Sequence, residues 1–430
     1  MGLLGPEEAW LSLRDALPLL GRERVPVQRA HGRVLAQEVL CPRDVPSEAR
    51  SMRDGYAVAP LSGSGSGAIP VEGHSAAGRP WLGRLAPGSA VRVSTGAVIP
   101  EGGIAVVPLE EVKESRDGSI LSFEGSPPEV GSHIAAKGSF LKQGTSLLNV
   151  GVRLGPPELC LLVAAGVESV WVGRRPSVFL LPTGSELAVP GAALEPGQSF
   201  ASHVWYLASR LKEEGARPTV YPPVADNAGE LGEAIKDAVS KADLVVTTGA
   251  TGPSDGDLLL RVLNSLGARV IFKGLCMRPG GTTCAYALDS TVVIGLPGGA
   301  GGVGVGCELL VIPAARRLQG WGGPEPPWVP CRLGEAIPRA RGHHRFVEVS
   351  IEIETGALRA WPLARGVPGT GLVPLTGGGW IHVPPGLGEL PEGNLSRLLP
   401  GGESWLLKGC RQRPDDRLGE HPLDPPAPVK

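Results

Sequence analysis

Between positions 174 and 320, the spacing of the hydrophobic residues switches repeatedly between a strand-like and a helical pattern. Short strand-like apolar runs are each followed by a segment with apolar residues at helical spacing. The strand and helix pairs are 177–184 with 198–214, 218–226 with 230–242, and 243–249 with 257–267, followed by strands 268–274 and 290–298 and a long apolar helix at 303–318. Because this alternation is typical of βαβ crossovers, it predicts an α/β fold with a doubly wound, mostly parallel sheet and helices on both faces.

The segments on either side of this region have different patterns. Residues 6–20 and 156–168 carry apolar side chains at helical spacing and predict two further helices. Residues 22–134 consist of short strand-like pieces broken by Gly, Pro and Ser, which predict a small β-rich domain. Period-two alternation at 347–354 predicts a small β-barrel or sandwich over 328–400.

Composition narrows the class of protein. The chain has 63 Gly and 43 Pro among 430 residues, yet 42% of residues are hydrophobic and no repeats occur, which indicates an ordered, turn-rich protein. The net charge of -2 without a long run of one sign argues against a nucleic-acid partner. The apolar stretch Leu159 to Val167 is too short to cross a bilayer, and the N-terminus lacks a signal-peptide pattern. We therefore expect a cytoplasmic protein with no membrane partner.

Candidate chemistry lies in the loops after the predicted strands, because ligands bind beyond the carboxyl ends of strands in open α/β sheets. These loops are 183–187, 225–226, 248–257, 276–283 and 295–302. In the third loop, Gly249 and Gly252 can bring backbone N–H groups close to an oxyanion, as in a phosphate cradle. Asp255 and Asp257 could coordinate a divalent cation there, or could be an N-cap and a first-turn acid.

Glu186 and Asp226 follow two other strands. Together with Asp257 they would converge on one crevice, and such a carboxylate set fits Mg²⁺ better than zinc, although each acid alone could simply be solvated or capping. Arg278 and Lys273 could supply positive charge for phosphate, while a Lys beside a strand is also typical of a solvated edge.

Three further polar sites lie outside these loops. Asp54 in SMRDGYAV and Thr95 in STGAVIPEGG are each compatible with a turn or with a site role. His343 and His344 are adjacent before a predicted strand, and we expect them in a surface turn.

Five motifs, in order and across the chain, resemble the MoeA family, the molybdopterin molybdenumtransferases that include the gephyrin E domain. The resemblance covers residues 6–402. Its anchors are VPVQRAHGRVLAQEVLCPRDVP (25–46) with SMRDGYAV (51–58), STGAVIPEGGIAVVPLEE (94–111), LLPTGSEL (180–187), ADLVVTTGATGPSDGD (242–257) and VVIGLPG (292–298).

The resemblance implies a cytoplasmic homodimer that inserts molybdate into adenylylated molybdopterin and releases AMP, assisted by Mg²⁺. Molybdopterin-AMP and molybdate would be substrates, and a MogA-type adenylyltransferase and molybdoenzyme chaperones are further candidate partners. The site would lie between the α/β domain of one subunit and the small β-rich domain of the other. The implied domains are a helical linker and dimerisation domain (1–42 and 135–173), a small β-rich domain (43–134), a MogA-like molybdopterin-binding α/β domain (174–320) and a C-terminal β-barrel (328–402). The many Pro and charged residues at the C-terminal end predict a disordered tail over 403–430.

The resemblance also assigns site residues. Five positions keep the acid or Thr of a family motif and are the expected catalytic residues: Asp54, Thr95, Glu186, Asp226 and Asp257. Three of them, Glu186, Asp226 and Asp257, would hold Mg²⁺. The expected cofactor-binding residues are Thr183, Gly184, Gly249, Thr251, Gly252, Ser254, Arg278, Pro297 and Gly298.

Several positions depart from the family pattern. An acid is replaced by Phe140, and Ser185 replaces the first acid of T-G-D-E-L. The Lys and Pro of P-G-K-P become Gly281 and Thr282, and the Asn and Pro of L-P-G-N-P become Gly299 and Ala300. The lost Lys removes a cation that could neutralise phosphate or molybdate.

These retentions and departures support three hypotheses. The leading one is a divergent molybdopterin molybdenumtransferase. The alternative is a weakened MoeA-like protein that binds the cofactor as a carrier or scaffold. A third, an adenylyltransferase of MogA type, rests on TGATG, which is close to the TGGTG pattern of the MogA relatives.

Overall fold

The computed structural model describes residues 2–61, 67–124, 126–252, 258–338, 342–354, 356–363, 378–386 and 388–402. The chain divides into two compact units, one formed by Met1–Glu23 with Gly173–Lys430 and the other by Arg24–Val172. Helix α1 (Pro6–Ala16) belongs to the first unit. The division into four domains stays a prediction.

The first unit contains a six-stranded sheet. Its strands, in spatial order, are β16 (Arg217–Val220), β13 (Ser177–Pro182), β17 (Leu244–Thr248), β21 (Thr291–Leu296), β20 (Cys284–Leu288) and β18 (Arg269–Lys273). The first four are parallel, and β20 and β18 run antiparallel to their neighbours. The predicted parallel core is therefore confirmed, and β20 is a strand that the sequence pattern missed.

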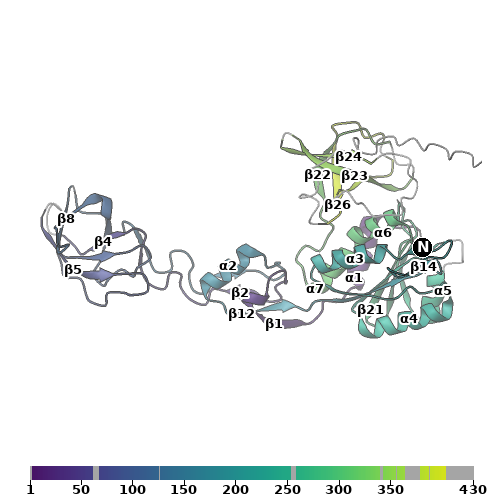
Figure 1. The fold of residues 1–430 in the computed structure, drawn as a ribbon, viewed down its shortest axis with the longest axis horizontal. Coiled ribbons are helices and arrows are strands. Elements are labelled where there is room, and N and C mark those ends of the chain that lie inside the picture. The colour runs from purple at the N-terminus through teal and green to yellow at the C-terminus, as the bar shows by residue number, and fades with distance from the viewer. Residues whose placement is uncertain are drawn as a thin grey trace, which may run out of the picture. The chain divides into compact units, whose positions relative to one another are not determined.

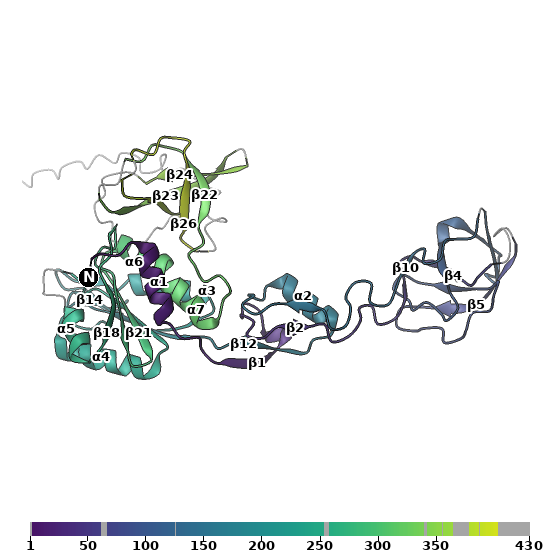
Figure 2. The same ribbon diagram turned by 180° about the vertical axis from the view of Figure 1, so that it is seen from behind.

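Helices cover both faces of this sheet, as predicted (Figures 1 and 2). Leu180, Val246 and Ile294 pack on one face, against α1, α3 (His203–Glu213), α6 (Ala300–Gly306) and α7 (Ile312–Gln319). Leu181, one residue after Leu180, and Val245, one residue before Val246, pack on the other face, against α4 (Ala228–Lys241) and α5 (Leu258–Ser265). This two-residue alternation in buried strands explains why the strands are apolar at nearly every position.

The long apolar helix predicted at 303–318 is interrupted by a π-helical segment, η4 (Cys307–Val311), between α6 and α7. Pro313 lies just after this segment. Proline has no N–H to donate and its ring clashes with the carbonyl four residues earlier. The wider π turn accommodates this clash without ending the helix.

A second sheet in the first unit closes into a barrel. Its strands are β22 (Val329–Leu333), β23 (His344–Glu354), β24 (Ala357–Pro362), β25 (Gly379–Val383) and β26 (Leu395–Pro400). The ring closes because β23 pairs with both β24 and β25. Of the two predicted forms, barrel and sandwich, the barrel is confirmed. The short strand β19 (Met277–Arg278) pairs in parallel with the start of β23.

One expectation for this barrel is wrong. His344 does not lie in a surface turn but begins β23, where its ring stacks on that of His382 with 5.1 Å between the centroids. His382 is buried and also stacks on Phe346. His344 is ordered in this way because it is the first residue of a strand that buries one of its faces, a position that the His343-His344 pair alone did not reveal.

The second unit contains the β-rich sheet expected from the sequence. Its strands, in spatial order, are β7 (Ala105–Pro108), β4 (Gly55–Val58), β6 (Ala90–Val93), β5 (Ile69–Ser75), β9 (Ile120–Phe123) and β8 (Val112–Glu114). Tyr56 and Val58 pack into one core, while Ala57 packs into another on the opposite side.

The predicted helix at 156–168 is α2 (Pro156–Ala165), in the second unit. Glu158 accepts a hydrogen bond from the Gly155 N–H at its start, and Gly166 ends it in the left-handed conformation. Short strand pairs accompany it: β1 (Arg22–Pro26) with β12 (Ser169–Gly173), β2 (Val39–Leu40) with β11 (Ser146–Leu148), and β3 (Arg50–Ser51) with β10 (Ile134–Ala135). No helix in the described ranges is both long and apolar enough to span a membrane.

Candidate functional site

Three neighbouring parallel strands end together at one edge of the α/β sheet. Pro182 of β13 pairs with Thr248 of β17, and Thr248 pairs with Leu296 of β21. The next residues are also linked, since Thr183 N–H donates to the Thr248 carbonyl (2.8 Å) and Gly249 N–H to the Leu296 carbonyl (3.0 Å). The loops that begin with Thr183, Gly249 and Pro297 therefore lie side by side, as the sequence predicted.

The Glu186 and Asp226 loops are tied to each other by a reciprocal pair of hydrogen bonds. Ser185 N–H donates to Asp226 Oδ2 (3.1 Å), and Asp226 N–H donates to Ser185 Oγ (3.0 Å). Ser185, which departs from the family motif, thus has a defined structural role. The carboxylate of Glu186 folds back over Gly184, where a Cβ would lie only 2.6 Å from Oε2. Both acids reach this edge of the sheet, while Asp257 and Ser254 lie outside the described residues.

A cavity of about 420 Å³ opens at this edge. Its lining combines an apolar part, including Leu187, Phe200 and Val204, with polar groups. The polar or small residues that line it are Thr183, Glu186, Ser199, Ser202, His203, Thr248 and Gly298. The lining thus suits a ligand with both a hydrophobic ring and polar or charged groups.

Thr183 is the most informative residue in this cavity. Its side chain is buried, with 4% of the residue exposed, and within the described part of the chain its Oγ1 atom has no hydrogen-bond partner. A buried hydroxyl without a partner costs free energy, roughly 1–3 kcal/mol in protein mutational data. A ligand oxygen in the cavity could satisfy it.

Backbone approach at the same edge requires glycine at position 249. Gly249 has a φ of +93°, and a Cβ on it would lie 2.2 Å from the Thr183 carbonyl oxygen. Gly298 approaches closely too, with the Gly249 Cα 3.8 Å from where its Cβ would be. A side chain is therefore excluded at Gly249, whereas a Cβ at Gly298 would make only ordinary contact, and of the two it is Gly298 that lines the cavity.

The remaining predicted binding residues that the structure describes do not line the cavity, and some of them instead connect neighbouring loops. Thr251 Oγ1 lies 3.1 Å from Thr282 Oγ1, so Thr282, a departure from the family pattern, links the third and fourth loops. Pro297 packs against Gly302. Arg278 instead lies on β19, paired with Arg345 at the barrel, and neither Arg278 nor Thr251 or Gly252 is among the described residues that line the cavity.

The positions that lost family side chains differ in the space around them. A Cβ at Gly299 would meet no atom within 4 Å, whereas at Gly281 it would lie 3.1 Å from the Met277 carbonyl oxygen. Phe140, in the second unit, is 67% exposed.

The sequence did not single out the segment 199–204, which forms one side of the cavity. It contains β15 (Ser199–Phe200) and the start of α3, and β15 pairs with β14 (Leu187–Ala188) directly after the Glu186 loop. The sequence pattern could have indicated this segment, because the helix predicted at 198–214 follows a strand and such a helix starts at the carboxyl edge of the sheet.

In the second unit, the structure brings Asp54 and Thr95 together. Asp54 Oδ1 accepts a hydrogen bond from the Thr95 N–H (2.8 Å). Beside Asp54 lies a concave region of about 670 Å³ that also includes Tyr56, His74 and Arg92. Burial, followed by the hydrogen bond to Glu114, raises the pKa of Tyr56 to about 12, so it stays a neutral donor at physiological pH.

The residues at the sheet edge fit a magnesium ion only with help from a ligand. Within the described ranges, no three His, Cys, Asp or Glu side chains come close enough to form a metal site by themselves. Mg²⁺ in enzymes is commonly held by one or two carboxylates together with substrate phosphates. Glu186 and Asp226 on adjoining loops meet that requirement.

The fold and this site define a protein with a MogA-like α/β domain, a β-rich unit and a C-terminal barrel, with a cavity at the carboxyl edge of the α/β sheet. The model of the MoeA N-terminal region (domain I and II) matches residues 4–166, and that of the probable molybdopterin binding domain matches residues 179–317. The chain belongs to the MoeA family of molybdopterin molybdenumtransferases.

Individual relatives agree with this assignment. The molybdopterin molybdenumtransferase of a Nostoc species is 31% identical over 90% of this chain and 87% of its own length. That of Bacillus subtilis is 30% identical over 94% of this chain and 88% of its own length. The crystal structure of the molybdopterin biosynthesis MoeA protein from Pyrococcus horikosii superposes with a TM-score of 0.78, at 28% identity, over 93% of this chain and 99% of that one.

Proposed function

We propose that this protein is a molybdopterin molybdenumtransferase in molybdenum cofactor biosynthesis, which inserts molybdate into adenylylated molybdopterin and releases AMP. The similar proteins from Nostoc and Bacillus subtilis carry the name of this activity. The observation that carries the proposal in the structure is the cavity at the sheet edge, where the buried Thr183 hydroxyl has no partner among the described residues.

Each part of the cavity suits one part of the proposed substrate. The apolar side chains of Leu187 and Phe200 can pack against the pterin ring. Thr183 Oγ1 can donate to a phosphate or pterin oxygen, and Gly298, which lines the cavity without a side chain, leaves its backbone N–H accessible to phosphate oxygens. Ser199 and Ser202 add hydroxyl donors on the opposite side.

Mg²⁺ would be held by Glu186 and Asp226, together with phosphate oxygens and the predicted third ligand Asp257. When bound, the ion would neutralise charge on the phosphates. Ser185 serves this arrangement, because its two hydrogen bonds with Asp226 hold the two loops in register. Ser185 can therefore connect the two loops although it replaces the first acid of the family's T-G-D-E-L motif.

Asp54 and Thr95 complete the proposal. The hydrogen bond from the Thr95 N–H fixes one oxygen of the Asp54 carboxylate and leaves the other available to a ligand. As the family resemblance implies, these residues would act from a second copy of the chain in a cytoplasmic homodimer. Light scattering checks this part, since a monomer at working concentration would contradict it.

The test of the proposed function is reconstitution with adenylylated molybdopterin, molybdate and Mg²⁺. We expect molybdate-dependent AMP release and formation of cofactor that activates an apo-molybdoenzyme. Asp226→Asn is the test variant, since it removes one metal ligand charge, and we expect activity to fall by roughly 10²-fold. Tight binding of molybdopterin with no AMP release would overturn the proposal and leave a carrier function.

A further inference from the structure

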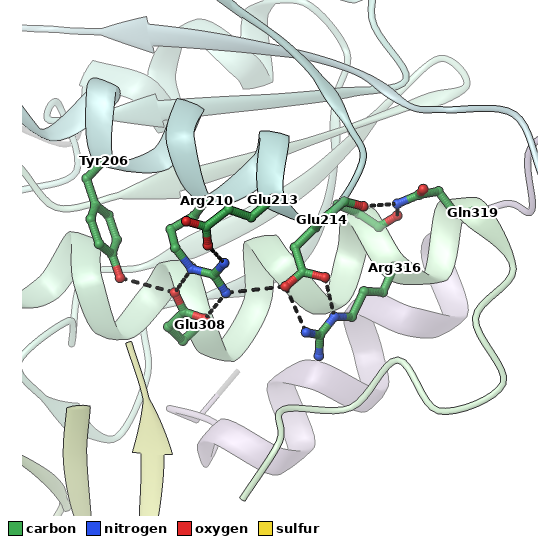
Figure 3. Close-up of polar contacts among 8 residues, drawn as sticks. Tyr206, Arg210, Glu213, Glu214, Glu308, Arg316 and Gln319 are labelled. Carbon is green, nitrogen blue, oxygen red and sulfur yellow. Dashed lines mark hydrogen bonds and ion pairs between the residues drawn. The ribbon is translucent and has the colours of Figure 1, made fainter. Parts of the chain in front are cut away.

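A network of buried charges joins helix α3 to the η4 and α7 segments (Figure 3). Arg210 on α3 donates to both oxygens of Glu308 on η4, from Nε at 2.8 Å and from Nη2 at 3.0 Å. Tyr206, one turn earlier on α3, donates its hydroxyl to Glu308 Oε1 at 3.1 Å. The Glu308 side chain is 1% exposed and the Arg210 side chain 6%. Glu308 is therefore fully desolvated and held by two residues of a different helix.

The same helices are joined a second time, two turns further on. Glu214, just after α3, accepts two hydrogen bonds from Arg316 on α7, at 2.8 and 3.0 Å, and one from Arg210 at 3.3 Å. Gln319 donates to the Glu214 carbonyl at 2.9 Å. Two buried arginines thus face two buried carboxylates, and Arg210 also pairs with the exposed carboxylate of Glu213. Charge-assisted, bidentate bonds of this kind fix geometry as well as contributing energy.

The two connections define the register between the helices. Tyr206 contacts Glu308 and Glu214 contacts Arg316, so the partners are offset by 102 residues at both ends. The helices therefore run in parallel, and a shift of one along the other would break both connections together. The π turn contributes, because Glu308 lies within it, just before Pro313.

Helix α3 begins at the cavity, and so does α6, which continues directly into η4 and α7. Ser202, His203 and Val204, at the start of α3, line one side, and Gly298, just before α6, lines another. Tyr206 lies three residues after His203, which is about 4.5 Å along a helix. The connections that fix α3 against η4 therefore also fix the spacing between two walls of the cavity.

We propose that Glu308, held by Arg210 and Tyr206, is a positioning residue that sets the width of the substrate cavity by fixing the start of α3 relative to Gly298. The part of the proposal that concerns catalysis rests on the proposed function. The positional part stands on the contacts alone. Burial and then the charge of Glu308 raise the pKa of Tyr206, which keeps its hydroxyl protonated as the donor.

The experiment compares Glu308→Gln with Asp243→Asn as a matched control. Asp243 makes a similar set of contacts, accepting from Arg174 (2.9 Å) and from the Ser177 N–H (2.8 Å), but it lies just before β17, at the opposite edge of the sheet. Amide hydrogen exchange is measured by mass spectrometry in both variants, on peptides that cover 199–206 and 296–300. No substrate is needed for this part.

We expect faster exchange at 199–206 in Glu308→Gln, with wild-type exchange there in Asp243→Asn even if the two variants lose similar thermal stability. Tyr206→Phe removes one hydrogen bond only and should give a smaller change in the same peptide, which keeps the test valid if Glu308→Gln folds poorly. Unchanged exchange at 199–206 in both Glu308→Gln and Tyr206→Phe would overturn the proposal, since the network would then contribute stability alone.

The kinetic part uses adenylylated molybdopterin. We expect Glu308→Gln to lower kcat/KM roughly 10- to 100-fold, chiefly by raising KM, while Asp243→Asn leaves KM within about twofold of wild type. Equal KM values in the two variants would overturn the proposal. If the wild-type protein itself releases no AMP, the proposed function fails, and the exchange experiment still decides whether Glu308 positions α3.

Discussion

The α/β unit treats its buried polar groups in two different ways. Between α3 and α7, Arg210, Glu308, Glu214 and Arg316 satisfy one another. At the sheet edge, Thr183 keeps a buried hydroxyl that has no partner among the described residues. The first region is therefore complete without a ligand, whereas the Thr183 hydroxyl is left for a ligand in the cavity to satisfy.

The largest expected effect is on the closed network. Arg210→Ala leaves the buried carboxylates of Glu308 and Glu214 without their shared partner, so we expect a loss of about 3–5 kcal/mol in the free energy of unfolding. Urea denaturation of the variant and of wild type measures it. A loss below about 1 kcal/mol would mean that water reaches the site and that the network is not closed.

Gly249→Ala tests the close backbone contact beside Thr183 at the carboxyl edge of the sheet. A Cβ would meet the Thr183 carbonyl oxygen at 2.2 Å, and φ is +93°, so we expect roughly 2–4 kcal/mol of destabilisation. The β13 and β17 loops would move apart, and AMP release should fall with stability. Gly299→Ala is the matched control, because its Cβ would meet no atom within 4 Å. Equal losses in the two variants would contradict a close backbone approach at Gly249.

His382 in the barrel is another buried polar group without a full set of partners among the described residues, and it makes the stability of the protein depend on pH. Its Nε2 lies 2.8 Å from His344 Nδ1, and its buried Nδ1 has no partner within the described ranges. Burial, and then the proximity of His344 and Arg397, lower its pKa to about 4, although Glu7 acts in the opposite direction. Between pH 6.5 and 4 the unfolded chain therefore binds a proton that the folded chain does not. Stability falls as pH falls through that window, by up to about 3 kcal/mol at pH 4.

Thermal unfolding between pH 7 and 4 checks this dependence. His382→Gln is the test variant, and it should flatten the pH profile while lowering stability at pH 7. The neighbouring His344 also has a lowered pKa, caused first by burial, so a smaller slope should remain in the variant. An unchanged slope would show that the unpaired Nδ1 of His382 is solvated.

The smallest effect on stability is expected at Thr183. Thr183→Val keeps the shape of the side chain and removes a buried hydroxyl without a partner, so the free energy of unfolding should stay within about 1 kcal/mol of wild type or rise. Chemical denaturation in the absence of ligand measures it. A loss of 2 kcal/mol or more would indicate that the hydroxyl already has a partner within the protein.

Much of the fold could be predicted from the sequence, because buried parallel strands such as β13 and β17 are long apolar runs that alternate with helical segments. β20 was missed because CAYAL follows the polar Thr282-Thr283 pair and is only five residues long. The π turn was missed because it depends on how Pro313 packs in a helix that otherwise looks continuous.

The candidate site was predictable in part for the same reason. Strand ends place Thr183, Gly249 and Gly298 at one edge, and motif spacing was sufficient to find them. Ser199 was missed because it reaches the cavity through the β14–β15 pairing, which follows no strong pattern. His203 could have been found, because it begins the helix that follows β13 and such a helix starts at the carboxyl edge of the sheet. The bonding of Ser185 with Asp226 requires side-chain geometry that the sequence does not contain.

Isothermal titration calorimetry of adenylylated molybdopterin with wild type and with Thr183→Val measures whether the Thr183 hydroxyl binds the substrate. We expect binding to the variant to be weaker by about tenfold, because one hydrogen bond to a charged ligand is lost, with no loss of stability. Equal affinity in the two proteins would contradict the claim that the open sheet edge is the substrate site.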